Sequence, residues 1–307
     1  MHHLIFLLTF GILMTTVYTN KNGNIQNSQA NKVQEHNEGP KEEISSPDSK
    51  EIKRGLKRLI KLIDETKDDV ISEEELTKWI YKTHRKMDMD RTEDNFKKAD
   101  VNKDGTITWE EHLKKEYGYT TEDVKGLDTK KDEETAFFAS SIIQDREKFQ
   151  TADKDGNDVL DLNEYDALLN PAYHKHMAVI ESKIILKYLD QDNDSKLTVK
   201  EMADYREDLP EKEDDWPRAV KLAQKEFVAH DLNEDGVFDF DEVVAWFLPP
   251  MEVIASDDVK ELIKKADSNK DGKLSEKEIL DSYDFFDANA AISQAYTENS
   301  YKLKDEL

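Results

Sequence analysis

A twelve-residue pattern of oxygen-bearing side chains recurs six times in this chain of 307 residues. Each copy has Asp at position 1, Glu at position 12, a polar oxygen-bearing side chain at positions 3, 5 and 9, and an apolar residue at position 8. A chain that repeats one local unit builds its core from contacts between the copies, so this repeat constrains the fold more than any other feature. The copies start at Asp64, Asp100, Asp153, Asp190, Asp231 and Asp267.

The pattern suits calcium, a hard cation that takes six to eight oxygen ligands at about 2.3–2.6 Å. Positions 1, 3 and 5 supply side chains, position 7 a backbone carbonyl, and Glu at position 12 both of its oxygens. Three copies also have Gly at position 6, where the sharp turn favours positive φ. We expect these three loops to bind best. Their predicted ligands are Asp100, Asn102, Asp104, Thr106, Thr108 and Glu111; Asp231, Asn233, Asp235, Val237, Asp239 and Glu242; and Asp267, Asn269, Asp271, Lys273, Ser275 and Glu278.

The other three loops lack glycine at position 6, where they have Asp69, Asp158 and Ser195. Asp tolerates positive φ better than most residues, and Ser is less suited to it. Two of these loops keep a full ligand set, which is Asp153, Asp155, Asn157, Val159, Asp161 and Glu164, and Asp190, Asp192, Asp194, Lys196, Thr198 and Glu201. The first loop is expected to bind most weakly, through Asp64, Thr66, Asp68, Val70, Ser72 and Glu75.

Apolar residues at helical spacing flank the loops, as in Leu56, Leu59, Ile60 and Ile63 before the first one. A single helix-loop-helix hand cannot bury such faces, but two paired hands can. Successive loop starts are separated by 36, 53, 37, 41 and 36 residues. We therefore predict an all-α fold of three paired EF-hand units, in which the short spacings pair the loops starting at 64 and 100, 153 and 190, and 231 and 267. The eighth residues should form the strand contact within each pair.

The composition along the chain divides it into segments. Residues 51–117, 135–206 and 218–290 are predicted to be the three pairs, joined by polar linkers at 118–134 and 207–217, of which the second contains Pro210 and Pro217. Residues 20–50 hold almost no large apolar side chains, which predicts a disordered arm. Residues 291–307 form a C-terminal tail.

Both ends of the chain carry targeting patterns. Residues 1–19 are predicted to be a cleaved signal peptide, because their apolar run is too short for a membrane span. An uncleaved anchor is the alternative, since His2 and His3 stand where basic residues are usual. The last four residues, Lys304 to Leu307, match an endoplasmic-reticulum retrieval signal, which predicts a lumenal protein and a KDEL-type retrieval receptor as a partner. No later segment is long and apolar enough to cross a membrane.

The formal net charge of −25 argues against nucleic acid as a partner, because no basic patch stands against this acidity. It also predicts that calcium drives compaction, since self-repulsion opposes folding until cations are bound. The absence of cysteine excludes thiol chemistry. The histidines at 84, 112, 174, 176 and 230 are scattered, and we expect solvated side chains rather than a zinc site. The one Asn-x-Ser acceptor, Asn193, is expected to be mostly unmodified.

Local strings give a resemblance to a known family. They are Trp109-Glu110-Glu111 followed by Tyr117-Gly118-Tyr119, Trp246-Phe247-Leu248-Pro249, and Tyr283-Asp284-Phe285-Phe286. With six hands and no cysteine, residues 50–307 resemble the reticulocalbin and calumenin family of secretory-pathway proteins. The resemblance implies low-affinity calcium binding, client or regulatory partners in the lumen, and no catalytic activity. The ending differs from the His-Asp-Glu-Leu ending common in that family.

We therefore predict a calcium-binding protein of the endoplasmic-reticulum lumen that buffers calcium and binds client or regulatory proteins. Two alternatives remain, which are a secreted calcium-binding factor and a carboxylate-dependent enzyme. No residue pattern supports the enzyme, and the hands already occupy most of the chain. Candidate client-binding side chains, although their helical spacing favours the core, are Trp79, Trp216, Trp246, Tyr205 and Met251.

Overall fold

The structure, a computed structural model, describes residues 49–127, 130–204 and 216–295. The predicted signal peptide, most of the predicted arm and the retrieval signal lie outside these residues. The chain divides into two compact units, one from residues up to Ile80 and from Asp257 onward, the other from Tyr81 to Ser256. Their boundaries fall within two helices, and each unit is described here by itself.

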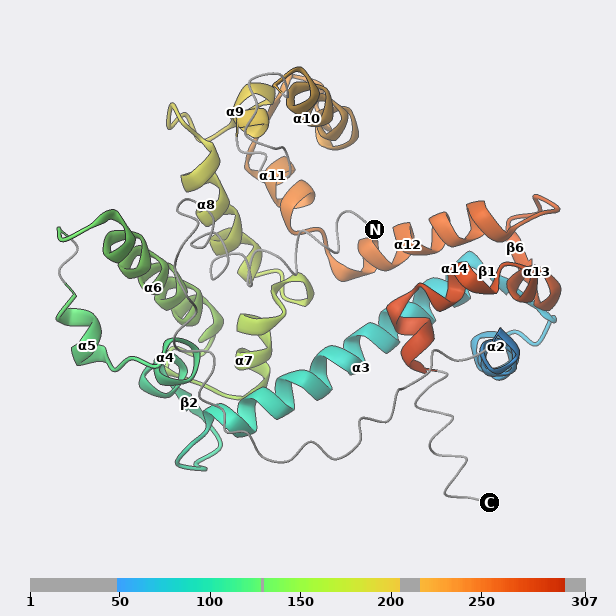
Figure 1. The fold of residues 1–307 in the computed structure, drawn as a ribbon, viewed down its shortest axis with the longest axis horizontal. Coiled ribbons are helices and arrows are strands. Elements are labelled where there is room, and N and C mark those ends of the chain that lie inside the picture. The colour runs from blue at the N-terminus through green and yellow to red at the C-terminus, as the bar shows by residue number, and fades with distance from the viewer. Residues whose placement is uncertain (1–48, 128–129, 205–215, 296–307) are drawn as a thin grey trace, which may run out of the picture. The chain divides into compact units, whose positions relative to one another are not determined.

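The first unit holds the first and sixth hands. Its elements are α2 (Ser49–Ile63), β1 (Val70–Ser72), the start of α3 (Glu73–Ala99), the end of α12 (Met251–Ala266), β6 (Lys273–Ser275), α13 (Glu276–Asp281) and α14 (Tyr283–Asp287). Strand β1 is antiparallel to β6, with Ile71 opposite Leu274. The two calcium-type loops are therefore joined back to back through their eighth residues, as Figure 1 shows for β1 and β6.

The core of the first unit forms around these two strand residues, which are completely buried. The apolar face of α2 packs there through Leu56 and Leu59, which are also buried. Residues beyond the sixth hand contribute as well, because Phe286 and Ile292 are only 2% and 1% exposed. The packed structure thus continues past residue 290, where the predicted third pair ended.

The second unit holds the four middle hands. After the rest of α3 come β2 (Ile107–Thr108), α4 (Trp109–Tyr117), α5 (Thr121–Lys125), α6 (Glu133–Ala152), β3 (Val159–Leu160), α7 (Leu162–Leu169) and the short 3₁₀ helix η2 (Pro171–Tyr173). The unit continues with α8 (Met177–Leu189), β4 (Leu197–Thr198), α9 (Val199–Asp204), α10 (Trp216–His230), β5 (Val237–Phe238), α11 (Phe240–Phe247) and the start of α12. Helix α5 lies inside the segment predicted to be a linker.

Two strand pairs organise this unit. Strand β2 is antiparallel to β3 with Ile107 opposite Leu160, and β4 is antiparallel to β5 with Leu197 opposite Phe238. All four of these eighth residues are completely buried, which confirms their predicted place at the centre of each pair. In the pair of loops 4 and 5, Phe238 stacks on Phe227 of α10 with ring centroids 4.0 Å apart.

The pairing of the loops differs from the one predicted. Consecutive loops were expected to pair as 64 with 100, 153 with 190 and 231 with 267. The strands instead join the first loop to the sixth, the second to the third and the fourth to the fifth. The loops that pair along the chain are those with the longer spacings of 53 and 41 residues, so the short spacings were the wrong guide to pairing.

Helix α3 gives the physical reason for this correction. It runs unbroken for 27 residues from the first loop to the second and contains neither glycine nor proline. Such a helix rises about 40 Å, so the loops at its two ends cannot turn back onto each other. With the first and second loops kept apart, the strands join the second loop to the third, the fourth to the fifth and the first to the sixth. The lack of Gly and Pro between residues 73 and 99 is the sequence signal that indicates this continuous helix.

A buried carboxylate ties the second hand to the third within the second unit. Asp166 of α7 is completely buried and forms an ion pair with Arg85 of α3 at 2.7 Å. It also accepts hydrogen bonds from the Thr92 hydroxyl at 3.1 Å, the Asn170 amide at 2.8 Å and the His174 ring at 2.7 Å. Burial raises the pKa of Asp166, but its partners outweigh burial and hold that pKa below the ordinary value.

The histidines are not all solvated, as was expected. His84 and His112 are buried, and His112 bonds to Asp145 at 2.7 Å while its ring lies 5.5 Å from that of Trp109. An imidazole ring is apolar enough to pack on aromatic rings once a carboxylate satisfies one of its nitrogens. The sequence does not show that Asp145 lies beside His112, so it did not predict this burial.

The candidate client-binding side chains divide between core and surface. Trp246 and Met251 are buried, Trp79 is half-buried and Trp216 is exposed, whereas Tyr205 lies outside the described residues. Among the residues that the structure describes, no helix combines the length and the apolar character needed to cross a membrane.

Candidate metal centres

All six loops share one hydrogen-bonded frame around position 1. In each loop, one oxygen of the first Asp accepts a hydrogen bond from the backbone N–H of position 6, with N···O distances of 2.8–3.1 Å. A backbone N–H of position 4 or 5 donates to its other oxygen. The first Asp is thus held against the turn in every loop, as the predicted ligand pattern requires.

The glutamate at position 12 closes each loop from the other side. One of its oxygens accepts a hydrogen bond from the N–H of position 9 at 2.9–3.0 Å in all six loops. Its other oxygen accepts from the N–H of position 2 or 3 at 2.7–3.4 Å. Both oxygens of this glutamate therefore reach back into the loop from the exiting helix.

The exiting helices explain why this glutamate is so well placed. Position 9 is also the N-cap residue of the helix, and its side chain accepts from the N–H of position 12 in Thr108, Asp161, Asp239 and Ser275. The sequence pattern is therefore a capping box, in which the cap and the third helical residue satisfy each other. One pair of residues both starts the helix and orients a metal ligand.

The missing glycines do not distort the frame. Asp69, Asp158 and Ser195 adopt φ of 65°, 66° and 66°, while Gly105 has 84°. A left-handed backbone costs a non-glycine residue roughly 1–2 kcal/mol, so the loop contacts must offset this strain. In the third loop a glycine stands instead at position 4, where Gly156 has φ of 72°.

Carboxylate oxygens converge most closely in the third, fourth and fifth loops. Within 4.8 Å of one another lie oxygens of Asp153, Asp155 and Glu164, of Asp190, Asp192 and Asp194, and of Asp231, Asp235 and Glu242. These are also the loops that carry four carboxylates at ligand positions, against three in each of the others. Like charges this close repel unless a cation lies among them, so these clusters suit a divalent ion. They include the two glycine-less loops that were expected to rank below the second and sixth.

In the second loop, the position 3 and position 5 side chains contact one another. The Asn102 amide donates to Asp104 at 2.9 Å, and its carbonyl oxygen accepts from the Asp104 N–H at 2.8 Å. The hydroxyl of Thr106 is the main cause that lowers the pKa of Asp104. In the sixth loop, Asn269 accepts from the Asp271 N–H in the same way, at 2.8 Å. Both loops have an amide at position 3 and a hydroxyl residue at position 9, so three carboxylates remain, whereas the fifth loop has the amide but keeps Asp239 at position 9.

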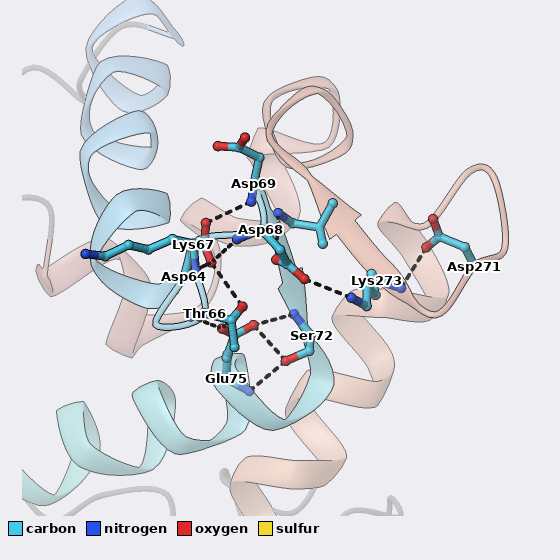
Figure 2. A network of polar contacts seen from close by, with 10 residues as sticks. Asp64, Thr66, Lys67, Asp68, Asp69, Ser72, Glu75, Asp271 and Lys273 are labelled. Atoms are coloured by element: carbon cyan, nitrogen blue, oxygen red, sulfur yellow. Dashed lines mark hydrogen bonds and ion pairs between the residues drawn. The ribbon is translucent and has the colours of Figure 1, made fainter.

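The first loop satisfies its ligands with protein donors, as Figure 2 shows. The Thr66 hydroxyl donates to Glu75 at 3.0 Å, and the Ser72 hydroxyl donates to the other Glu75 oxygen at 2.7 Å. Burial raises the pKa of Glu75, but these donors and the matching backbone N–H groups lower it to about 2. The carboxylate is thus stabilised in its charged form without a metal.

A lysine from the sixth loop reaches the first loop across the strand pair. The Lys273 ammonium lies 3.1 Å from a carboxylate oxygen of Asp68, the position 5 ligand of the first loop (Figure 2). This contact is the main cause that holds the pKa of Asp68 below its ordinary value. Lys273 was predicted to contribute its backbone carbonyl at position 7 of its own loop. The role of its side chain could not be read from the sequence, because it depends on the pairing of the first and sixth loops.

Six loops with this ligand frame, arranged in three back-to-back strand pairs between helices, define an EF-hand calcium-binding protein. The family model for an EF-hand domain pair matches residues 53–115 and 220–283. Each match covers two consecutive hands, whereas the strands pair other combinations of loops. The protein is a calcium-binding protein and not an enzyme.

Relatives that match most of the chain identify its family within the EF-hand proteins. It is 30% identical to Reticulocalbin-2 of Mus musculus over 262 residues, 84% of this chain and 80% of the relative. It is 31% identical to Reticulocalbin-3 of Mus musculus over 242 residues, 78% of this chain and 72% of the relative. Reticulocalbin-2 of Crotalus adamanteus is 30% identical over 250 residues, 80% of each chain. The chain belongs to the reticulocalbin family.

Proposed function

We propose that this protein buffers calcium in the lumen of the endoplasmic reticulum and binds client or regulatory proteins there in a calcium-dependent way. The main support for the proposal is the common geometry of the six loops. In each loop, backbone N–H groups orient the Asp carboxylate at position 1 and the Glu carboxylate at position 12 toward the loop, where a cation would bind. Calcium is abundant in the lumen, where sites with dissociation constants of about 10⁻⁴–10⁻³ M are sufficient. The net charge of −25 favours such binding, because each ion relieves self-repulsion.

The proposed ligands are the oxygen-bearing residues predicted in all six loops, but the order of the loops is revised. The third, fourth and fifth loops should bind best, because their carboxylates already converge within 4.8 Å. The second and sixth loops should follow, and the first loop should be weakest because the Lys273 ammonium already pairs with its position 5 carboxylate, Asp68.

Calorimetric calcium titration of residues 20–307 tests the assignment. Glu164→Gln and Glu242→Gln should each remove one measurable site, since they convert a charged bidentate ligand into a neutral one. Glu261→Gln on the surface of α12 removes the same charge away from any loop and serves as the matched control. Undiminished stoichiometry in both loop variants would contradict the proposed sites.

The location is tested separately. A cleaved signal at residues 1–19 and retrieval through Lys304 to Leu307 predict that deletion of these four residues sends the protein into the medium. Calcium binding should be unchanged, since no loop residue is removed. Retention in cells after the deletion would refute retrieval through this tail, and equal secretion of both forms would favour the alternative of a secreted factor.

A further inference from the structure

Helix α2 is basic although the chain as a whole is strongly acidic. Its fifteen residues, from Ser49 to Ile63, contain six Lys or Arg and a single Glu. The expectation that no basic patch stands against the acidity therefore fails at this helix. Its basic residues are Lys50, Lys53, Arg54, Lys57, Arg58 and Lys61.

The apolar side of α2 is not available to a partner, because it forms the core of the first unit. The opposite side is exposed and carries Arg54, Lys57, Arg58 and Lys61. Their spacing of i, i+3, i+4 and i+7 places all four on one face of the helix. We call these four residues the basic stripe, and it extends over about 10 Å of helix.

Most of the basic stripe is unpaired within the part of the chain that the structure describes. Lys57 forms an ion pair with Glu276 at 2.9 Å. Arg54, Arg58 and Lys61 make neither an ion pair nor a hydrogen bond with any described residue. Exposed lysines of α12 in the same unit behave otherwise, since Lys260 pairs with Asp257 and Lys264 with Glu261.

We propose that the basic stripe is a docking surface for an acidic peptide segment of a client protein. The inference names the class of partner within the proposed client-binding role, and it rests on that role. Guanidinium groups form two parallel hydrogen bonds with one carboxylate, so Arg54 and Arg58, one helical turn apart, fit alternate acidic side chains on one face of an extended segment. Screening limits the reach of charges to about 8 Å at physiological salt, so the stripe acts locally despite the net charge.

A peptide fits this surface better than an anionic membrane does. A basic helix binds a bilayer by burying its apolar face there, and in α2 that face is already buried within the protein. The helix also leads directly into the acidic first loop, where exposed carboxylates such as that of Asp69 would be repelled by a flat anionic surface. A narrow peptide can lie along the stripe and avoid them.

Fluorescence anisotropy of a labelled deca-glutamate peptide, titrated with residues 20–307 in saturating calcium, tests the proposal. Arg54→Glu/Arg58→Glu should weaken binding by about tenfold or more, because two attractions become repulsions. Lys260→Glu/Lys264→Glu makes the same change of charge on α12 and should leave binding within about twofold. Deca-glutamine should not bind, and added salt should weaken the deca-glutamate complex.

Three outcomes would overturn the proposal: no binding of the deca-glutamate peptide, equal losses in the two double variants, or binding of vesicles rich in anionic lipid through the stripe in place of the peptide. Circular dichroism of both variants with calcium controls for folding. Calorimetric calcium titration of the same samples separates the two levels of inference. Normal calcium binding without peptide binding refutes only the docking surface, whereas a failure to bind calcium refutes the proposed function itself.

Discussion

The buried Asp166 allows a quantitative test of how the second and third hands are held together. Its side chain has four partners, two on each carboxylate oxygen, and it is completely buried. In Asp166→Asn the oxygen that accepts from Thr92 and Asn170 can be kept. The other oxygen becomes an NH₂ group that faces the Arg85 guanidinium, a donor against a donor.

The expected cost follows from the lost contacts. A hydrogen bond to a charged group contributes about 1.5–3 kcal/mol, and breaking a buried ion pair costs about 3–5 kcal/mol. Because Arg85 is partly exposed and recovers some hydration, we take the lower end and expect Asp166→Asn to lower the free energy of unfolding by about 3 kcal/mol. Asp166→Ala, which removes all four contacts, should cost at least as much.

Urea unfolding of the calcium-saturated protein, followed by circular dichroism, measures this difference. Amide hydrogen exchange should place the loss of protection in α3 and α7. Asp257→Asn on the exposed surface of α12 removes the same charge from an exposed pair and should change stability little. A loss below about 1 kcal/mol in Asp166→Asn would refute the reasoning, because it would mean that the buried network contributes no net stability.

Three further predictions concern the pair of the first and sixth loops. Ser72→Cys/Lys273→Cys, which lie opposite each other in β1 and β6, should form a disulfide on oxidation. Asp239→Cys/Lys273→Cys places the two cysteines at the equivalent positions 9 and 7 of the fifth and sixth loops and should not form one; mass spectrometry decides between them. In a Glu278→Gln background, Lys273→Met should raise the calcium affinity of the first loop several-fold by removing a competing cation, and unchanged calorimetry would contradict this. The backbone N–H and the hydroxyl of Ser275 lower the pKa of Glu278 to about 2, below the ordinary value near 4.3. Without calcium, the ionised Glu278 should therefore stabilise the fold fully above about pH 4.5, and this stabilisation should be lost as the pH falls to about 2. If Glu278→Gln leaves an acid titration followed by circular dichroism unchanged, this carboxylate does not contribute.

The parts of this protein that depend on local spacing can be read directly from its amino-acid sequence. The twelve-residue frame and the capping boxes fix each loop and its exiting helix, because every contact involved spans twelve residues or fewer. The all-α fold of paired hands and the class of ligand followed from the same repeat. Even the positive φ at Asp158 and Ser195 follows from the frame once the flanking ligands are in place.

Which hands pair, and which residues the pairing brings together, depends on packing between distant parts of the chain. All six eighth residues are apolar and nearly interchangeable, so the loop sequences alone do not select a partner. The unbroken helix α3 excludes pairing of the first loop with the second, and the strands join the first loop to the sixth. The contact between Asp68 and Lys273, 205 residues apart, and the burial of Asp166 beside Arg85 depend on that choice, and no local pattern encodes either of them.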